Sequence, residues 1–149
     1  MATIISTVAL LLSVTAFVQN RMNGRRDLLL KVHDRLLGAE QQHGRRLLFR
    51  MAEEGRAAKD LTEEEFAAIN HALSQMNVLA YLLRKRYVPR RDASELWGLT
   101  MARAWRAAQT VGFIELRDDQ NVSPIWPFFR AFATHLIATD ARLQPRETT

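Results

Sequence analysis

The first twenty residues constrain this chain more than any other stretch, because no charged side chain occurs among them. From Ala2 to Asn20 nearly every residue is apolar or small, and as a helix this stretch would rise about 28 Å, close to the thickness of a bilayer's hydrocarbon core. Basic side chains follow at once, beginning with Arg21. A charge-free helix with positive charge on its C-terminal flank is typical of a single span with its N-terminus outside and its C-terminal flank in the cytoplasm.

We therefore predict a transmembrane anchor over residues 1–20, placed in the inner membrane. The large side chains expected to contact lipid are Ile4, Ile5, Val8, Leu11, Leu12 and Phe17. Two alternatives remain open. A cleaved signal peptide would fit the small residues Val14 to Ala16, but it would normally begin with a positive segment that is missing here. The other is a helix of a soluble bundle, but an amphipathic helix of that kind should show a polar stripe, and this segment offers only Ser and Thr hydroxyls.

A seam of small side chains follows one face of the predicted anchor. It consists of Ala2, Ser6, Ala9, Ser13 and Ala16, which recur at spacings of four and three residues. Such seams let two membrane helices approach closely. The seam predicts a weak homodimer through the anchor, with Leu29, Val32 and Leu36 extending the contact beyond the membrane.

The positive charge is concentrated just after the anchor. Residues 21–50 hold eight basic and three acidic side chains, whereas residues 51–149 hold thirteen of each, so the net charge of +5 lies near the membrane. We expect anionic lipid head groups, rather than nucleic acid, to be the partner of this charge. The predicted contacts are Arg21, Arg25, Arg26 and Lys31. The chain has no cysteine, which excludes disulfides and thiolate zinc sites.

Beyond the anchor, the spacing of apolar residues predicts only helices, and the fold class is all-α. The predicted organisation is a basic stalk helix at 21–38, a bundle of about four helices at 39–143 and a disordered tail at 144–149. Gly24 and Gly44 should weaken their helices. Capping boxes are expected at Thr62 with Glu65 and at Asp92 with Glu95. The last predicted helix begins with Ser123 as its N-cap and Pro124 at its first position.

The predicted core positions follow the helical period. On the second helix, 39–54, they are Leu47, Leu48 and Met51, with Arg45, Arg46 and Arg50 facing outward. On the central helix they are Phe66, Ile69, Leu73, Met76, Ala80, Leu83 and Tyr87. The next helix, ending at about 112, contributes Trp97, Met101, Ala104, Ala108 and Val111. The last helix contributes Ile125, Phe129, Phe132, Leu136 and Leu143.

The order of these segments resembles a known family. The markers are Leu47-Leu48-Phe49, Ala68 to Leu73, Trp97-Gly98, Trp105, Phe113-Ile114 with Arg117, and Pro127 to Phe132. Together with the N-terminal anchor and the basic stalk they resemble the bacterial membrane-tethered family catalogued as domain of unknown function number four-seven-six-zero. The resemblance implies a helical fold and an anchor, and it implies no catalytic residues.

Few residues suggest chemistry. Glu40 and His43 form one Glu-x-x-His pair, which is half of a di-iron carboxylate site, and no second copy occurs in the sequence. His33 and Asp34 are adjacent, as in some metal phosphohydrolases, and His71 and His135 are expected at the edge of the core. No phosphate-binding loop or serine-hydrolase motif occurs. We expect no enzyme activity, no cofactor and no metal site.

The densest basic cluster lies further along the chain. Five of the eight residues from Arg84 to Arg91 are basic. This cluster is expected to complement the negative end of a helix, or to contact anionic lipid, or to contact the phosphates of nucleic acid. The predicted function is a membrane-anchored cytoplasmic interaction or scaffold module with an unknown protein partner. A membrane-associated nucleic-acid-binding or regulatory protein is the alternative, and a metal-dependent hydrolase using His33, Asp34, Glu40 and His43 is the third.

Overall fold

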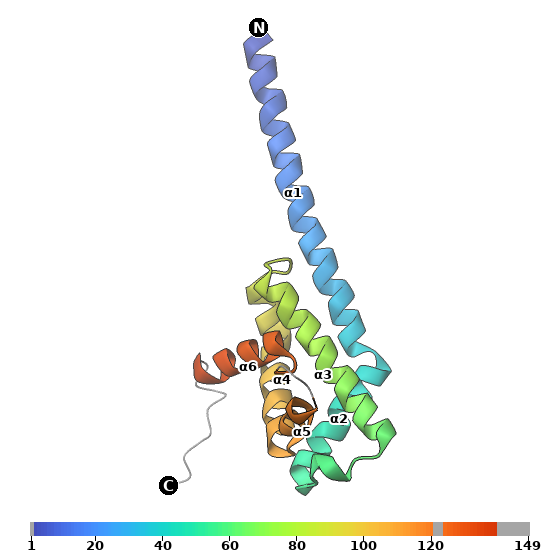
Figure 1. Ribbon diagram of the computed structural model, residues 1–149. Helices are drawn as coiled ribbons and strands as arrows, with labels where there is room; N and C mark the ends of the chain where they lie inside the picture. Colours follow the sequence, from blue (N-terminus) through green and yellow to red (C-terminus); the bar gives the residue numbers. More distant parts are fainter. Residues whose placement is uncertain (1, 121–123, 140–149) are drawn as a thin grey trace.

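A computed structural model of the protein describes residues 2–120 and 124–139, with side chains from Ser13 onward. Helices are the only regular elements in these ranges, which confirms the predicted all-α class. The elements are α1 (Ala2–Leu37), α2 (Ala39–Glu54), η1 (Ala58–Asp60, a short 3-10 helix), α3 (Glu63–Arg84), α4 (Arg90–Thr110), α5 (Phe113–Asp119) and α6 (Pro127–Thr139) (Figure 1). The expected tail at 144–149, Leu143 and Ser123 lie outside the described residues.

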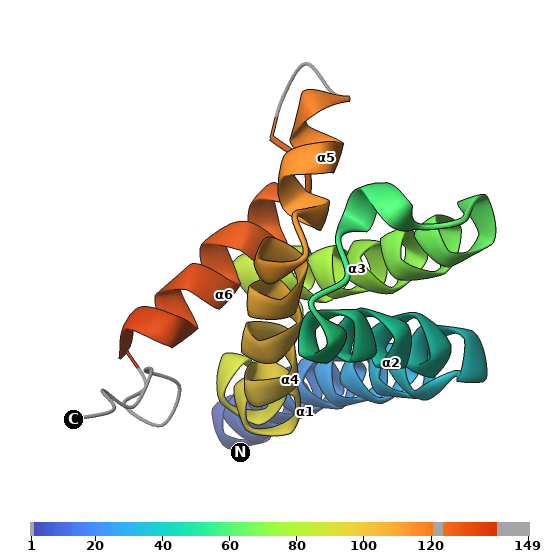
Figure 2. The same ribbon diagram turned by 90° about the horizontal axis from the view of Figure 1, so that it is seen from below.

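Four of these helices form a ring around one core. α2 and α6 each pack against both α3 and α4, so the ring runs from α2 through α3 and α6 to α4 (Figure 2). The short helix α5 packs against α4 and η1. α5 was not predicted from the sequence, because its seven residues are too few to show a helical period.

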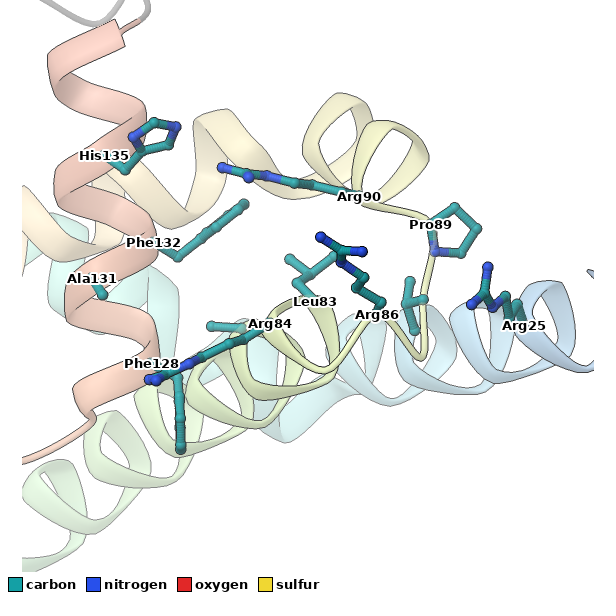
Figure 3. Close-up of a pocket in the computed structure, with 12 residues that line it drawn as sticks. Arg25, Leu83, Arg84, Arg86, Pro89, Arg90, Phe128, Ala131, Phe132 and His135 are labelled. Carbon is teal, nitrogen blue, oxygen red and sulfur yellow. The ribbon is translucent and has the colours of Figure 1, made fainter.

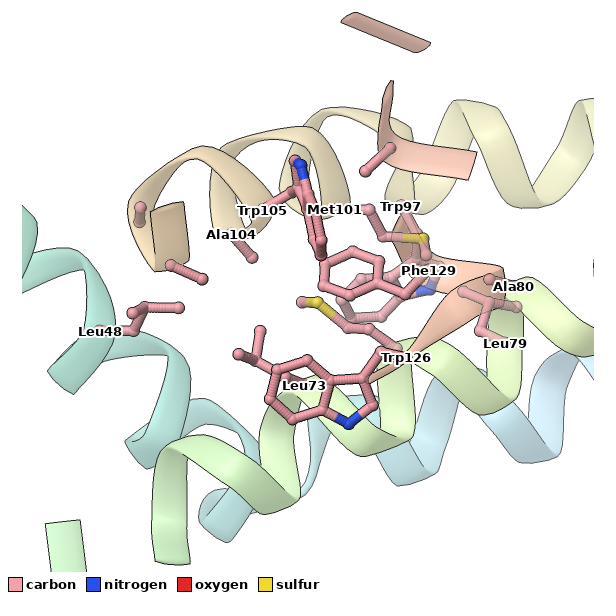
Figure 4. Packing of buried hydrophobic residues seen from close by; sticks show 14 of the residues in the cluster. Leu48, Leu73, Leu79, Ala80, Trp97, Met101, Ala104, Trp105, Trp126 and Phe129 are labelled. Atoms are coloured by element: carbon pink, nitrogen blue, oxygen red, sulfur yellow. The ribbon is translucent and has the colours of Figure 1, made fainter. Parts of the chain in front are cut away.

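Aromatic side chains fill the centre of the ring. Trp105 of α4 and Phe129 of α6 meet edge to face, with ring centroids 5.4 Å apart, and Met101 is fully buried (Figure 4). The predicted core positions that are buried are Leu48, Met51, Ile69, Leu73, Met76, Ala80, Leu83, Trp97, Met101, Ala104, Ala108, Val111 and Phe129. Leu47, Phe66, Ile125, Phe132 and Leu136 are only partly buried.

One of the predicted helix starts is confirmed and two are wrong. The capping box of Thr62 and Glu65 is confirmed, since both of its hydrogen bonds are present at the start of α3. The box of Asp92 with Glu95 is wrong, because α4 already begins at Arg90 and has no side-chain cap. Pro124 is also not the first residue of the last helix. That place belongs to Pro127, where the missing N–H of proline costs nothing.

Helix α6 is capped by a side chain from another helix. The Oδ1 atom of Asn77, on α3, accepts hydrogen bonds from the backbone nitrogens of Phe128 and Phe129, both at 3.1 Å. The indole nitrogen of Trp126 donates to Oγ of Ser74, one turn earlier on α3. The sequence N-terminal to α6 therefore did not have to supply its cap, and α3 fixes where α6 begins.

Helix α1 runs for 36 residues without a break, and only its C-terminal part packs on the bundle. Leu29 and Leu36 are buried and Val32 is partly buried, whereas every residue from Ser13 to Gly24 is exposed. The N-terminal half projects beyond the bundle as a free rod (Figure 1). Because Leu29 and Leu36 face the bundle, the prediction that they extend a contact between two copies is wrong.

Arg45 joins α1 to the bundle. Its Nη1 atom donates to the carbonyl oxygen of Leu36 at 2.8 Å, and its guanidinium lies 5.4 Å from the centre of the Trp97 ring. The indole nitrogen of Trp97 in turn donates to Nδ1 of His33 at 3.2 Å. The prediction that Arg45 faces outward is wrong: it is buried, and burial, followed by the charge of Arg46, lowers its pKa. The contact satisfies a carbonyl at the negative end of α1.

Candidate functional site: a basic cleft beside the free half of α1

A cleft of about 690 Å³ opens at the end of the bundle from which α1 projects. Its walls are the end of α3, the turn between α3 and α4, the first residue of α4, and one face of α6 (Figure 3). Arg25 of α1 contributes from the other side of that turn (Figure 3). The cleft thus combines three separate stretches of the sequence: Arg25, residues 80–90 and residues 128–135.

The cleft is strongly basic. Arg25, Arg84, Arg86 and Arg90 line it, and His135 of α6 stands at its edge. Within the described residues none of these four arginines forms an ion pair, and no acidic residue lines the cleft. Arg91 differs, because its Nε atom is 3.0 Å from Oε1 of Glu95. Arg84, Arg86 and Arg90 therefore place three positive charges between the turn and α6, and Arg25 adds a fourth from the other side of the turn (Figure 3).

The turn that carries two of these arginines has a strained backbone. Tyr87 N donates to the carbonyl of Leu82 and Arg86 N to that of Leu83, which is the double hydrogen-bond pattern of a Schellman helix end. Arg86 holds the left-handed position of this motif, with φ of 58°. Glycine is the usual residue there, since a Cβ atom makes this conformation unfavourable. The turn ends α3 at Arg84, so Tyr87 lies beyond the helix and is exposed, against the prediction that it is buried.

The inner wall of the cleft is apolar. Leu83 and Val88 are buried, and Phe128 and Phe132 of α6 form the opposite side (Figure 3). The guanidinium of Arg84 lies 5.3 Å from the centre of the Phe128 ring, a cation–π distance. This contact holds Arg84 at the boundary between the basic rim and the apolar wall.

Among the predicted lipid-contact residues, Arg25 lines the cleft. Arg25 is partly buried in the cleft, while Arg21, Arg26 and Lys31 are exposed on α1. Sequence reasoning noted the cluster from Arg84 to Arg91 but did not join Arg25 to it. No local signal marks Phe132 or His135 as neighbours of these arginines, because only the packing of α6 brings them there.

The predicted anchor falls mostly outside the part of the chain with described side chains. The side chains that are not described include the anchor residues Ile4, Ile5, Val8, Leu11 and Leu12 and the seam residues Ala2, Ser6 and Ala9. Of the remaining anchor and seam residues, Phe17, Ser13 and Ala16 are exposed. Among the described residues, no helix combines the length and apolarity needed to cross a membrane, so the predicted transmembrane helix is not supported.

The residues of the hydrolase hypothesis have other partners. His33 accepts the hydrogen bond of Trp97, and Oε1 of Glu40 lies 3.0 Å from Nδ1 of His71 rather than beside His43. Within the described ranges, no three His, Asp or Glu side chains come together in a metal-binding group. The structure therefore does not assemble His33, Asp34, Glu40 and His43 into one site.

Comparisons of the chain with family models, with curated proteins and with solved structures found no match. The resemblance to the membrane-tethered family stays a prediction.

Proposed function

We propose that this protein is a membrane-tethered helical interaction module whose bundle is held at the cytoplasmic face of the inner membrane by the N-terminal half of α1. The observation that carries the proposal is the exposure of apolar side chains on the free part of this helix. Phe17 is 68% exposed, and Val14, Val18 and Met22 are at least half exposed. Water does not favour such a surface, whereas a lipid environment does.

The charge pattern along α1 supports the same arrangement. No charged residue precedes Arg21, and exposed basic side chains follow at the point where the helix approaches the bundle. The basic cleft lies at this same end of the molecule, so the charges of α1 and of the α3–α4 turn would meet one anionic surface. Each basic residue near such a surface contributes about 1 kcal/mol.

Membrane tethering is tested by extraction of the full chain from isolated membranes at alkaline pH. The wild type should stay with the membrane, and a Val14→Arg, Phe17→Arg variant should move to the soluble fraction. A Leu96→Arg, Leu99→Arg variant adds the same charge to exposed leucines of α4 and should stay with the membrane. Release of the wild type, or retention of the Val14→Arg, Phe17→Arg variant, would contradict the tether.

Orientation is tested by fusing reporters to the C-terminus. A reporter that works only in the cytoplasm should be active, and a phosphatase that works only after export should not. Activity of the exported phosphatase would contradict the proposed orientation.

Nucleic-acid binding is a second candidate, because four arginines that line one cleft and form no ion pair within the described residues also suit a phosphate backbone. Binding of the full chain in detergent to a single-stranded and a double-stranded oligonucleotide should be measured at low salt. Affinity that falls steeply as salt rises would favour this candidate. No binding at low salt would remove it.

A further inference from the structure

We infer that the basic cleft binds the phosphate group of an amphiphile, with an anionic phospholipid of the surrounding membrane as the source. The inference rests on the proposed function, since the tether brings the cleft to the membrane surface. It adds a ligand class and a defined site on the bundle, formed by Arg25, Arg84, Arg86 and Arg90 with the aromatic wall of α6.

The cations match the chemistry of phosphate. Arginine offers a planar fork of N–H donors that fits two phosphate oxygens at once. Arg84, Arg86 and Arg90 all extend into the space between the turn and α6 (Figure 3). Within the described residues no carboxylate pairs with them, so a phosphate would meet no acidic competitor.

The first turn of α4 supplies a second attraction for an anion. This helix begins at Arg90 without a side-chain cap, so its first N–H groups lack the partner that most helix starts have. The positive end of the helix dipole lies at the same point. A phosphate held by Arg90 would complete the cap that the sequence does not provide.

The strained turn gives an independent reason to assign a site here. An arginine occupies a left-handed position where glycine would fit without strain. Residues in such conformations are concentrated at binding and active sites, where the side chain has a use that offsets the cost. Here the side chain of Arg86 points into the cleft (Figure 3).

The apolar wall distinguishes an amphiphile from a small free anion. Phe128 and Phe132 lie on the α6 side and Leu83 beneath the arginines, so an acyl chain could leave the phosphate along an apolar surface (Figure 3). Along α1, Arg25 lies about 7.5 Å beyond Asn20, the end of the charge-free stretch, and this rise is close to the depth of a head-group layer. The cleft is therefore at the level of lipid phosphates.

The test is native mass spectrometry of the full chain in detergent, titrated with phosphatidylglycerol or with neutral phosphatidylcholine. The wild type should retain one phosphatidylglycerol in preference to phosphatidylcholine. The triple variant Arg84→Gln, Arg86→Gln, Arg90→Gln should bind phosphatidylglycerol roughly 100-fold more weakly, at about fivefold per arginine. Circular dichroism of the variant checks that the helices remain.

A matched control removes the same charge outside the cleft. The variant Arg46→Gln, Arg50→Gln, Arg91→Gln changes three exposed arginines, of which Arg91 is already paired with Glu95. It should bind phosphatidylglycerol within about twofold of the wild type, because none of the three lines the cleft. Equal losses in the two triple variants would overturn the site and leave only a general charge effect.

Two further measurements separate the sources and the proposals. Glycerol 3-phosphate carries the phosphate without the acyl chain, and it should compete at least tenfold more weakly than lysophosphatidylglycerol. Equal competition would overturn the lipid source.

Flotation with vesicles of pure phosphatidylcholine tests the tether alone, because insertion of α1 needs no anion. If the triple variant Arg84→Gln, Arg86→Gln, Arg90→Gln floats with these vesicles and still prefers phosphatidylglycerol to phosphatidylcholine as strongly as the wild type does, the cleft is not the lipid site. That result would overturn this inference and would not affect the tether.

Discussion

Gly44 of α2 crosses α3 at Ala68 so closely that a Cβ atom on Gly44 would lie 2.3 Å from the carbonyl oxygen of Ala68. Real Cβ atoms do not approach backbone oxygens to this distance, so any side chain here forces the two helices apart. From the sequence alone, Gly44 was expected only to weaken its helix. The structure shows that this glycine allows α2 and α3 to pack in contact.

Gly44→Ala should therefore destabilise the protein by about 1–3 kcal/mol, even though alanine favours a helix more than glycine does. Gly24→Ala is the matched control, because nothing lies within 4 Å of a Cβ atom at Gly24. It should leave the bundle's stability unchanged or raise it by up to about 1 kcal/mol. Urea unfolding followed by circular dichroism measures both. A Gly44→Ala protein as stable as the Gly24→Ala protein would show that the crossing is not tight.

Asn77→Ala should cost about 1–2 kcal/mol of stability, because two N–H groups at the start of α6 lose their acceptor. Asn77→Asp keeps an oxygen in this place and suits the positive end of the helix, so it should stay near the wild type. Thermal unfolding of the two variants compares them directly. If both lose the same stability, the oxygen of residue 77 is not the cap of α6.

Glu65 should make the protein sensitive to acid. Hydrogen bonds from Arg56 and from the backbone of Thr62 lower its pKa from about 4.5 to about 2. Because the folded pKa lies below the unfolded one, the stabilisation is complete above pH 4.5 and is lost as the pH falls toward 2. Glu65→Gln should flatten this part of the stability profile, whereas Glu64→Gln, at an exposed position, should not. Identical acid profiles for wild type and Glu65→Gln would contradict the assignment.

Arg86→Gly should make the protein more stable and at the same time weaken phosphate binding. Glycine removes a left-handed strain of about 1–2 kcal/mol, and the substitution also removes one cation of the cleft. Arg86→Gln removes the cation but keeps the strain, so it should weaken binding without a gain in stability. Unfolding and lipid titration of the two variants separate these effects. A destabilised Arg86→Gly protein would show that the side chain, rather than the backbone, holds the turn.

The small-residue seam predicts a weak dimer in membranes through the free half of α1. Ala16→Ile should reduce cross-linking between copies several-fold, because a larger side chain blocks close approach of the helices. Val18→Phe adds comparable bulk about 200° away around the helix and should leave cross-linking unchanged. Cross-linking that ignores Ala16→Ile, or that never yields a dimer, would mean that the small residues reflect composition alone.

Local patterns could be predicted from the sequence, and contacts between distant segments could not. Thr62 and Glu65 act within one turn, so their spacing alone identified the start of α3. The start of α4 was misplaced because the preceding turn, not Asp92, determines where that helix begins. Arg45 was assigned to the surface because its partners, Leu36 and Trp97, belong to other helices.

The cleft shows the same limit. The cluster of arginines from Arg84 to Arg91 can be read from the sequence, but what it can bind depends on which side chains lie opposite it in the fold. Arg25 and Phe132 are more than a hundred residues apart and share the cleft only because α1 and α6 both pack against α3. No periodicity or spacing within a single segment could predict that these two residues line the same cleft.

The unbroken course of α1 also fixes an angular relationship. At about 100° per residue, Leu36 lies about 200° around the axis from Ala16, and Leu29 lies about 160° around from Ser13. The side of α1 that carries the bundle is therefore opposite the side that carries the small residues. Two copies joined along Ser13 and Ala16 would hold their bundles on opposite sides of the helix pair. The two bundles would then not obstruct one another.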